Sequence, residues 1–93
     1  MRNQPSETTL AHQLERELMS QYGPMVSNDA LRMVLGYSSK AAFRQALSRK
    51  TVPVPVFSLA NRRGKFALVR DVATWLAAQR ERAVAESAAP TTT

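Results

Sequence analysis

The side chains best suited to bind another molecule lie in two basic stretches near the middle of the chain. In the first, residues 40–49, cations and an amide share one side of an amphipathic helical pattern. In the second, residues 60–65, three cations surround a glycine. Guanidinium and amide groups form paired hydrogen bonds with base edges, whereas cations also bind phosphates. The two stretches therefore indicate a surface for a polyanion.

The first stretch gives each outward side chain a distinct expected role. Its outward side chains are Lys40, Ala41, Arg44, Gln45, Ser48 and Arg49. Arg44 can pair with a guanine and Gln45 with an adenine, while Ala41 allows close approach and can meet a thymine methyl group. Lys40 and Arg49 are expected to reach phosphates. The alternative is a solvated polar face, because helices with one basic face are common.

The positive charge of the chain is concentrated between residues 27 and 70. The whole chain has a net charge of +6. Residues 27–70 hold nine Lys and Arg residues against Asp29 alone, a net of +8, and the segments on either side are slightly acidic. Such a surface attracts polyanions and makes their binding sensitive to salt. A solvated surface that keeps the protein soluble is the alternative.

The composition argues against several other classes of protein. The chain has no cysteine, so it has no disulfide or thiolate metal site, which is compatible with a cytoplasmic, nucleoid-associated location. We expect no enzyme activity, metal or cofactor, because no phosphate-binding loop motif, paired metal ligands or paired carboxylates are visible. His12, the only histidine, is expected on the surface or in helix packing. No export signal or apolar run of about 18–20 residues is present, so we expect no membrane partner.

Two short helices joined by a tight turn are expected to position the first basic stretch. Apolar residues at i, i+1, i+4 and i+5 mark one buried face on each helix. The first helix is expected to follow a cap at Ser27 and run to Leu35, and the second to run from Lys40 to Arg49. Gly36 ends the first helix, and one of the two serines after Tyr37 caps the second.

A hairpin is expected to position the second basic stretch. The prolines of residues 53–55 exclude a helix, and residues 56–59 are expected to pair with residues 66–69. Gly64 supplies a turn angle that other residues resist. Three cations at one hairpin tip repel one another, which is unfavourable unless an anion lies beside them. These cations are Arg62, Arg63 and Lys65.

Helices are also expected near both ends of the chain. The N-terminal helix is predicted over residues 7–21, with Ser6 as its cap. Its leucine stripe either packs on the core of the domain or forms a dimer contact. The last helix is predicted to start at Asp71, to place Trp75 in the core and to give way to a frayed tail after Ala83. The leucine stripe consists of Leu10, Leu14 and Leu18.

Three motifs follow one another in the order of a known family. They are Leu35-Gly36-Tyr37, then Val52-Pro53, and finally Asp71-Val72-Ala73-Thr74-Trp75-Leu76, which is the most specific. Together with the basic hairpin, they resemble the small winged helix-turn-helix family of excisionases and AlpA-type regulators, which is related to the MerR DNA-binding domain. The resemblance covers residues 25–76. The turn has one serine more than the family pattern, and the N-terminal helix lies outside the minimal family domain.

The resemblance implies sequence-specific binding of double-stranded DNA. The second helix would lie in the major groove and the hairpin, as a wing, on the minor groove or backbone. By position, the resemblance assigns DNA contacts to Ser39, Lys40, Arg44 and Gln45 of the helix and to Arg62, Arg63 and Lys65 of the wing. It implies a transcription regulator or a recombination directionality factor of a plasmid, phage or other mobile element. Because one helix and one wing read few base pairs, we expect a homodimer or a cooperative homo-oligomer on DNA.

The predicted fold class is α+β, a small winged helix-turn-helix domain with an extra N-terminal helix. Residues 1–24 are expected to form a helical arm that could serve oligomerisation, residues 25–83 the DNA-binding domain, and residues 84–93 a flexible tail. The alternative function is a small interaction module whose basic helix and hairpin bind an acidic protein surface. RNA binding has less support, because no exposed aromatic pair is available to stack on bases.

Overall fold

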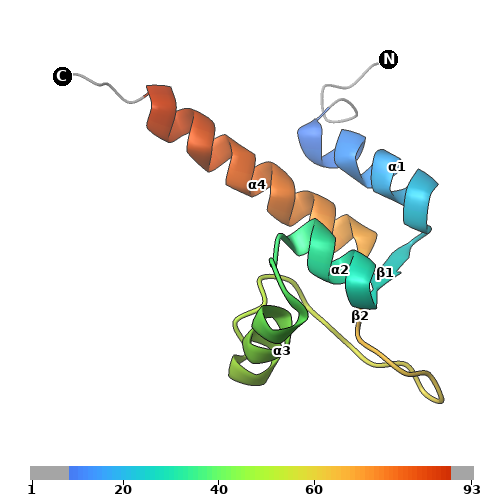
Figure 1. The fold of residues 1–93 in the computed structure, drawn as a ribbon. Helices are drawn as coiled ribbons and strands as arrows, with labels where there is room; N and C mark the ends of the chain where they lie inside the picture. The colour runs from blue at the N-terminus through green and yellow to red at the C-terminus, as the bar shows by residue number, and fades with distance from the viewer. Residues whose placement is uncertain (1–8, 89–93) are drawn as a thin grey trace.

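The computed structural model describes residues 9–88, which form four helices and one two-stranded antiparallel sheet (Figure 1). This part of the chain is a small α+β domain, as predicted. None of its helices is long and apolar enough to cross a membrane. The elements in chain order are α1 (Leu10–Tyr22), β1 (Met25–Ser27), α2 (Asn28–Leu35), α3 (Lys40–Arg49), β2 (Phe66–Leu68) and α4 (Val69–Ala88).

The sheet joins two segments that are far apart in the sequence. Its register pairs Met25 with Leu68, Val26 with Ala67 and Ser27 with Phe66. At one end of the sheet, the backbone N–H of Val69 donates to the carbonyl of Pro24 at 2.8 Å. At the other end, the N–H of Asn28 donates to the carbonyl of Lys65 at 3.1 Å. The sheet therefore fixes the points at which α2 and α4 begin.

The predicted pairing of residues 56–59 with residues 66–69 is wrong except at one position. Phe57 and Phe66 exchange backbone hydrogen bonds of 2.8 and 2.9 Å, and their rings stack with centroids 6.3 Å apart. The other edge of β2 pairs with β1, whose Val26 is buried. The preceding prolines lack N–H donors, so this segment is poorly suited to a longer ladder. β2 thus lies between a three-residue strand and a single bridge.

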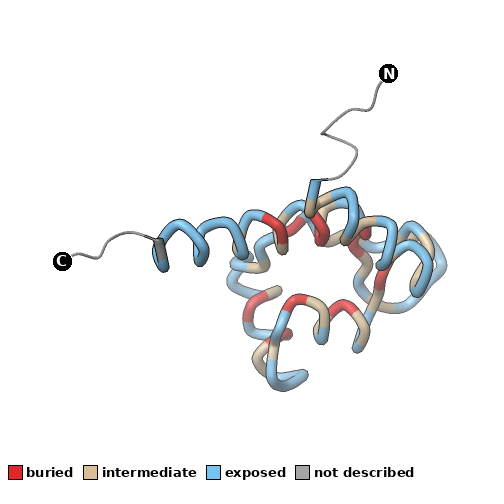
Figure 2. The backbone as a smooth tube through the Cα atoms, turned by 90° about the horizontal axis from the view of Figure 1, so that it is seen from above, coloured by how far each residue is buried: buried red, intermediate tan, exposed pale blue. Residues whose placement is uncertain are grey.

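The hydrophobic core lies where α2, α3 and α4 meet the sheet (Figure 2). The largest completely buried side chains are Leu31, Val69 and Val72. Phe43 brings α3 into this core, and the ring of Tyr37 packs on it with centroids 5.4 Å apart. Trp75, predicted to lie in the core, is half-buried and packs against the edge of the cluster.

α1 packs along α4, close to the start of the longer helix (Figure 1). The three stripe leucines are half-buried, and Leu18 and Tyr22 pack against the core cluster. This placement supports the alternative in which the leucine stripe covers the domain's own core. The N-terminal helix and the central elements share one packed unit over the described residues.

Several predicted helix boundaries are wrong. α1 begins at Leu10 rather than at residue 7, because the hydroxyl of Thr9 accepts from the backbone N–H of His12 at 3.2 Å and caps the helix. The predicted cap Ser6 lies outside the described residues. The side chain of Ser27 makes no capping hydrogen bond.

The last helix is longer than predicted at both ends. α4 begins at Val69 rather than at Asp71, because the backbone enters the helix directly from β2. It continues through the expected tail as far as Ala88, since residues 84–88 contain two alanines and a glutamate, which favour helix. The side chains of residues 80–87 are all exposed (Figure 2). The end of α4 therefore extends beyond the core.

Candidate nucleic-acid interface

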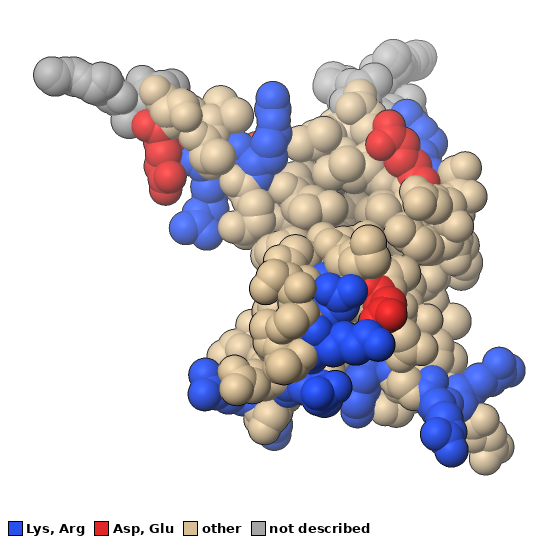
Figure 3. Space-filling view, viewed as in Figure 1, with Lys and Arg blue, Asp and Glu red and all other residues tan. Residues whose placement is uncertain are grey.

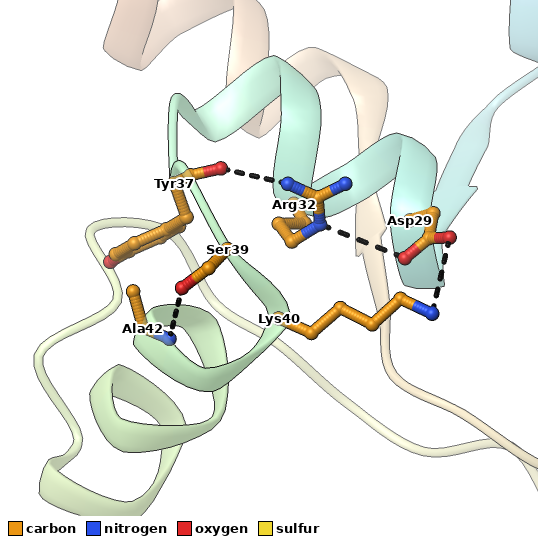
Figure 4. Close-up of polar contacts among 6 residues, drawn as sticks. All are labelled: Asp29, Arg32, Tyr37, Ser39, Lys40 and Ala42. Atoms are coloured by element: carbon orange, nitrogen blue, oxygen red, sulfur yellow. Dashed lines mark hydrogen bonds and ion pairs between the residues drawn. The ribbon is translucent and has the colours of Figure 1, made fainter.

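The turn between α2 and α3 is fixed at both helix ends and by one arginine (Figure 4). Gly36 ends α2 in the left-handed conformation, with φ 88°. The hydroxyl of Ser39 accepts from the N–H of Ala42 at 3.0 Å, so Ser39 is the cap of α3. Nη1 of Arg32 donates to the carbonyl of Tyr37 at 3.0 Å. Arg32 therefore holds the turn, although its charge adds to the basic surface.

α3 has one face in the core and one face in solvent, as its sequence pattern predicts. Phe43 and Ala46 are buried, and Leu47 is half-buried. The outward face is free of buried residues, so its side chains are available to a ligand. The exposed predicted site residues on and before α3 are Ser39, Lys40, Ala41, Arg44, Gln45, Ser48 and Arg49.

The basic loop, residues 58–65, carries the three predicted cations of the second stretch, and all three are exposed. A turn forms where the N–H of Arg62 donates to the carbonyl of Leu59 at 3.1 Å, with Asn61 at a positive φ of 62°. Nζ of Lys65 donates to the hydroxyl of Ser58 at 3.4 Å. The loop thus displays its cations on a turn and buries none of its side chains.

Asn28 attaches the base of the basic loop to the start of α2. Its side-chain oxygen Oδ1 accepts from the backbone N–H of Lys65 at 3.3 Å, beside the backbone hydrogen bond between the same residues. Gly64 has φ 104°, and a Cβ at this position would overlap the Asn28 side chain. Glycine is therefore required here both for its backbone angle and for the close approach of Asn28.

A groove of about 390 Å³ lies between α3 and the basic loop. Two apolar side chains of α3 and the basic groups on both elements contribute to its walls. The groove therefore brings the two basic stretches together, although they are far apart in the sequence. Its lining from these elements consists of Lys40, Phe43, Arg44, Leu47, Gly64 and Lys65. Three predicted site residues, Lys40, Arg44 and Lys65, belong to this lining. The others lie outside it, namely Ser39, Ala41, Gln45, Ser48, Arg49, Arg62 and Arg63.

Charge is unevenly distributed over the molecule (Figure 3). Basic side chains gather over the part of the surface formed by α3 and the basic loop, whereas acidic side chains occur mainly at α1 and at the end of α4. Asp29 is the only acidic residue between Glu17 and Asp71. Its carboxylate lies 3.9 Å from Nζ of Lys40 and 3.6 Å from Nε of Arg32. The basic surface thus contains a single negative charge, in the lining of the groove.

Besides Arg32, which also lines the groove, three further residues belong to this surface but were not predicted as part of it. Lys50 ends α3 in the left-handed conformation with φ 59°, where glycine is favoured, and its side chain is exposed. The sequence feature that could have pointed to Lys50 is a lysine directly after the helix, at the position where glycine usually ends a helix. Asn28 and Asp29 also contribute to the groove. The role of Asn28 could not be predicted from its neighbours in the sequence, because its partner Lys65 is 37 residues away.

Across residues 9–88, no group of three or more His, Cys, Asp or Glu side chains could hold a metal ion. His12 lies on the exposed side of α1, where its Nδ1 is 2.8 Å from the hydroxyl of Thr9. Comparison of the chain with known protein families, curated proteins and solved structures found no match.

Proposed function

We propose that this chain is a sequence-specific DNA-binding protein of the winged helix-turn-helix type, with α3 as the recognition helix and the basic loop as the wing. It would act as a transcription regulator or as a recombination directionality factor of a mobile element. The observation that carries the proposal is the groove between the two basic elements, which places Lys40 and Arg44 on the same surface as Lys65. A duplex that enters this surface meets both elements together.

The shape of α3 supports its proposed role in the major groove. Its ten residues form a short helix with an exposed outer face and a buried inner face. A helix of this kind fits the major groove, where its N-terminal half meets base edges. Arg44 lies in the middle of the exposed face beside Gln45, and both are long enough to form bidentate contacts. These two residues are proposed to read the sequence.

The basic loop supports a different kind of contact. Arg62, Arg63 and Lys65 are exposed at a turn, where they can meet phosphates or enter a narrow minor groove. The hydrogen bond from the backbone N–H of Lys65 to Asn28 fixes the base of the loop, while the tip of the loop remains in solvent. The three cations are therefore proposed to clamp the DNA backbone. Lys40, Arg49 and Lys50 are proposed to add phosphate contacts at the two ends of α3.

Selection of bound duplexes from a random library, followed by mobility-shift titration, tests the proposal. A DNA-binding protein of this type enriches a defined motif and binds it at least about a thousandfold more tightly than random duplex. With five or six phosphate contacts, the slope of log K against log salt should be near about −5. Failure to enrich any motif would contradict sequence-specific binding. Absence of binding even at low salt would favour an acidic protein as the partner of this surface.

A homodimer or a cooperative homo-oligomer on DNA is part of the proposal. One recognition helix and one wing contact only a few base pairs, so useful specificity requires two copies on a repeat or a cooperative array. The enriched motif would report this through the number and spacing of its half-sites. Sedimentation of the full chain with the selected duplex would show two or more chains per site. One chain on a single half-site would contradict assembly.

A further inference from the structure

We propose that the carboxylate of Asp29 is an internal competitor of DNA, which occupies the place of a phosphate beside Lys40 in the free protein. The inference rests on the proposed function and adds a control of affinity to the same surface. It assigns to Asp29 a role that opposes binding. On DNA, a phosphate would take the place of this carboxylate beside the ammonium group.

Asp29 is placed where a bound duplex would pass between the two basic elements. It lies in the first turn of α2 and contributes to the groove between α3 and the basic loop. A duplex bound to both basic elements has to run its backbone past this groove. Asp29 is the only acidic residue in the basic segment, so it is the one side chain there that repels the backbone.

The contacts of Asp29 show that the carboxylate is held weakly. Oδ2 lies 3.9 Å from Nζ of Lys40, and both side chains are more than half exposed. Oδ1 lies 3.6 Å from Nε of Arg32, which is too long for a hydrogen bond. Exposed ion pairs of this kind are screened by water and salt. A phosphate can therefore displace the carboxylate from Lys40 without disrupting a strong contact.

The role of Arg32 shows that Asp29 is not needed to hold the turn. Nη1 of Arg32 has its own acceptor, the carbonyl of Tyr37, at 3.0 Å (Figure 4). This hydrogen bond remains when the carboxylate of Asp29 is replaced by a neutral group. The acidic group favours the start of α2 through the helix dipole, and asparagine and serine have helix propensities close to that of aspartate.

A comparison of Asp29→Asn with Glu17→Gln tests the inference. Both variants remove one negative charge, but only the charge of Asp29 lies at the groove. Glu17 is exposed on α1. Asp29→Asn should bind duplex about two- to fivefold more tightly at moderate salt. Its salt slope should stay close to that of the wild type, because the same phosphate contacts Lys40 in both complexes. Glu17→Gln should match the wild type in both. Asp29→Ser serves as a second variant if the asparagine impairs folding.

A double-mutant cycle with Lys40→Ala identifies the route of the effect. If the carboxylate competes for Lys40, the gain from Asp29→Asn should largely disappear in the Lys40→Ala background. An undiminished gain there would overturn the inference, because the carboxylate would then act by general repulsion. Equal affinities for the wild type and Asp29→Asn would overturn it as well.

Elution from immobilised heparin separates this inference from the proposed function. Heparin is a polyanion, so it tests access to Lys40 without requiring recognition of DNA. Asp29→Asn should elute at higher salt than Glu17→Gln and the wild type, and this difference should shrink with Lys40→Ala. If the chain binds no duplex yet shows these shifts, the proposed function fails and the competition for Lys40 stands. Identical elution of all three proteins would overturn the competition.

Discussion

α3 and the basic loop carry similar charge but are held in place in different ways. α3 is anchored by its own apolar face, on which Phe43 and Ala46 are each 7% exposed, and by the cap at Ser39. The basic loop has no buried side chain. It is held at its base by Asn28 and by the single bridge between Phe57 and Phe66.

This difference suggests how the two elements would divide the work of binding. Bidentate pairing with a base edge requires a side chain on a backbone that is fixed by packing. Attraction to phosphates is less directional, so a loop with exposed cations can supply it. α3 is therefore the element suited to read sequence, and the basic loop is suited to add affinity.

The largest expected effect concerns the anchoring of α3. Phe43→Ala should lower the free energy of unfolding by about 3–5 kcal/mol, because it removes a buried ring from the core. Phe57→Ala removes a half-buried ring at the base of the loop and should cost about 1–2 kcal/mol. Urea unfolding followed by circular dichroism measures both. Similar losses of unfolding free energy for the two variants would show that α3 and the basic loop are anchored equally strongly.

Loss of an arginine from α3 should change sequence discrimination, whereas loss of arginines from the basic loop should change overall affinity. Arg44→Ala should reduce discrimination by about 1–3 kcal/mol at one base pair of the selected site, because a bidentate contact is lost. Replacing Arg62 and Arg63 together by alanine should weaken binding to all duplexes alike and make the salt slope less negative by about two units. Mobility-shift titrations on matched and single-mismatch duplexes separate the outcomes. A uniform effect of Arg44→Ala would show that α3 does not read this base.

The sequence was sufficient to predict the elements whose signals are local. α3 was predicted over its observed range, because its apolar spacing and the preceding serines lie within a dozen residues. Gly36 likewise predicted the end of α2, and the structure confirms its left-handed conformation. The exposed face of α3 followed from the same spacing. Local signals therefore predicted one of the two basic elements well.

The sequence was insufficient where the partners are distant. β1 is only three residues long, so its pairing with β2, about 40 residues later, leaves no recognisable alternating pattern. The contact of Asn28 with Lys65 likewise joins residues that are far apart in the sequence, and both residues line the groove. The cations of the loop were predicted as a group, but the attachment that positions them was not.

The contact between Asn28 and the basic loop can be broken by adding one methyl group at Gly64. Gly64→Ala should cost about 1–2 kcal/mol through its positive φ, and it should also push the loop away from Asn28. Gly23→Ala is the matched control, because its φ of 81° is similarly strained but no atom lies near the added Cβ. Both variants should lose stability in thermal unfolding. Only Gly64→Ala should weaken DNA binding when the protein is fully folded, and equal affinities would show that the loop position is unimportant.

The smallest expected effect lies at the end of α3, where stability and binding should change in opposite directions. Lys50 has the left-handed conformation that glycine adopts without strain, so Lys50→Gly should stabilise the fold by about 0.5–1 kcal/mol. The same change removes an exposed cation and should make the salt slope less negative by about one unit. Lys50→Ala is the control, because it removes the charge but keeps the backbone strain. Both variants should lose affinity alike, and only the glycine should raise the unfolding temperature. A gain in stability without loss of affinity would place Lys50 outside the DNA contacts and confine the phosphate contacts of α3 to its other cations.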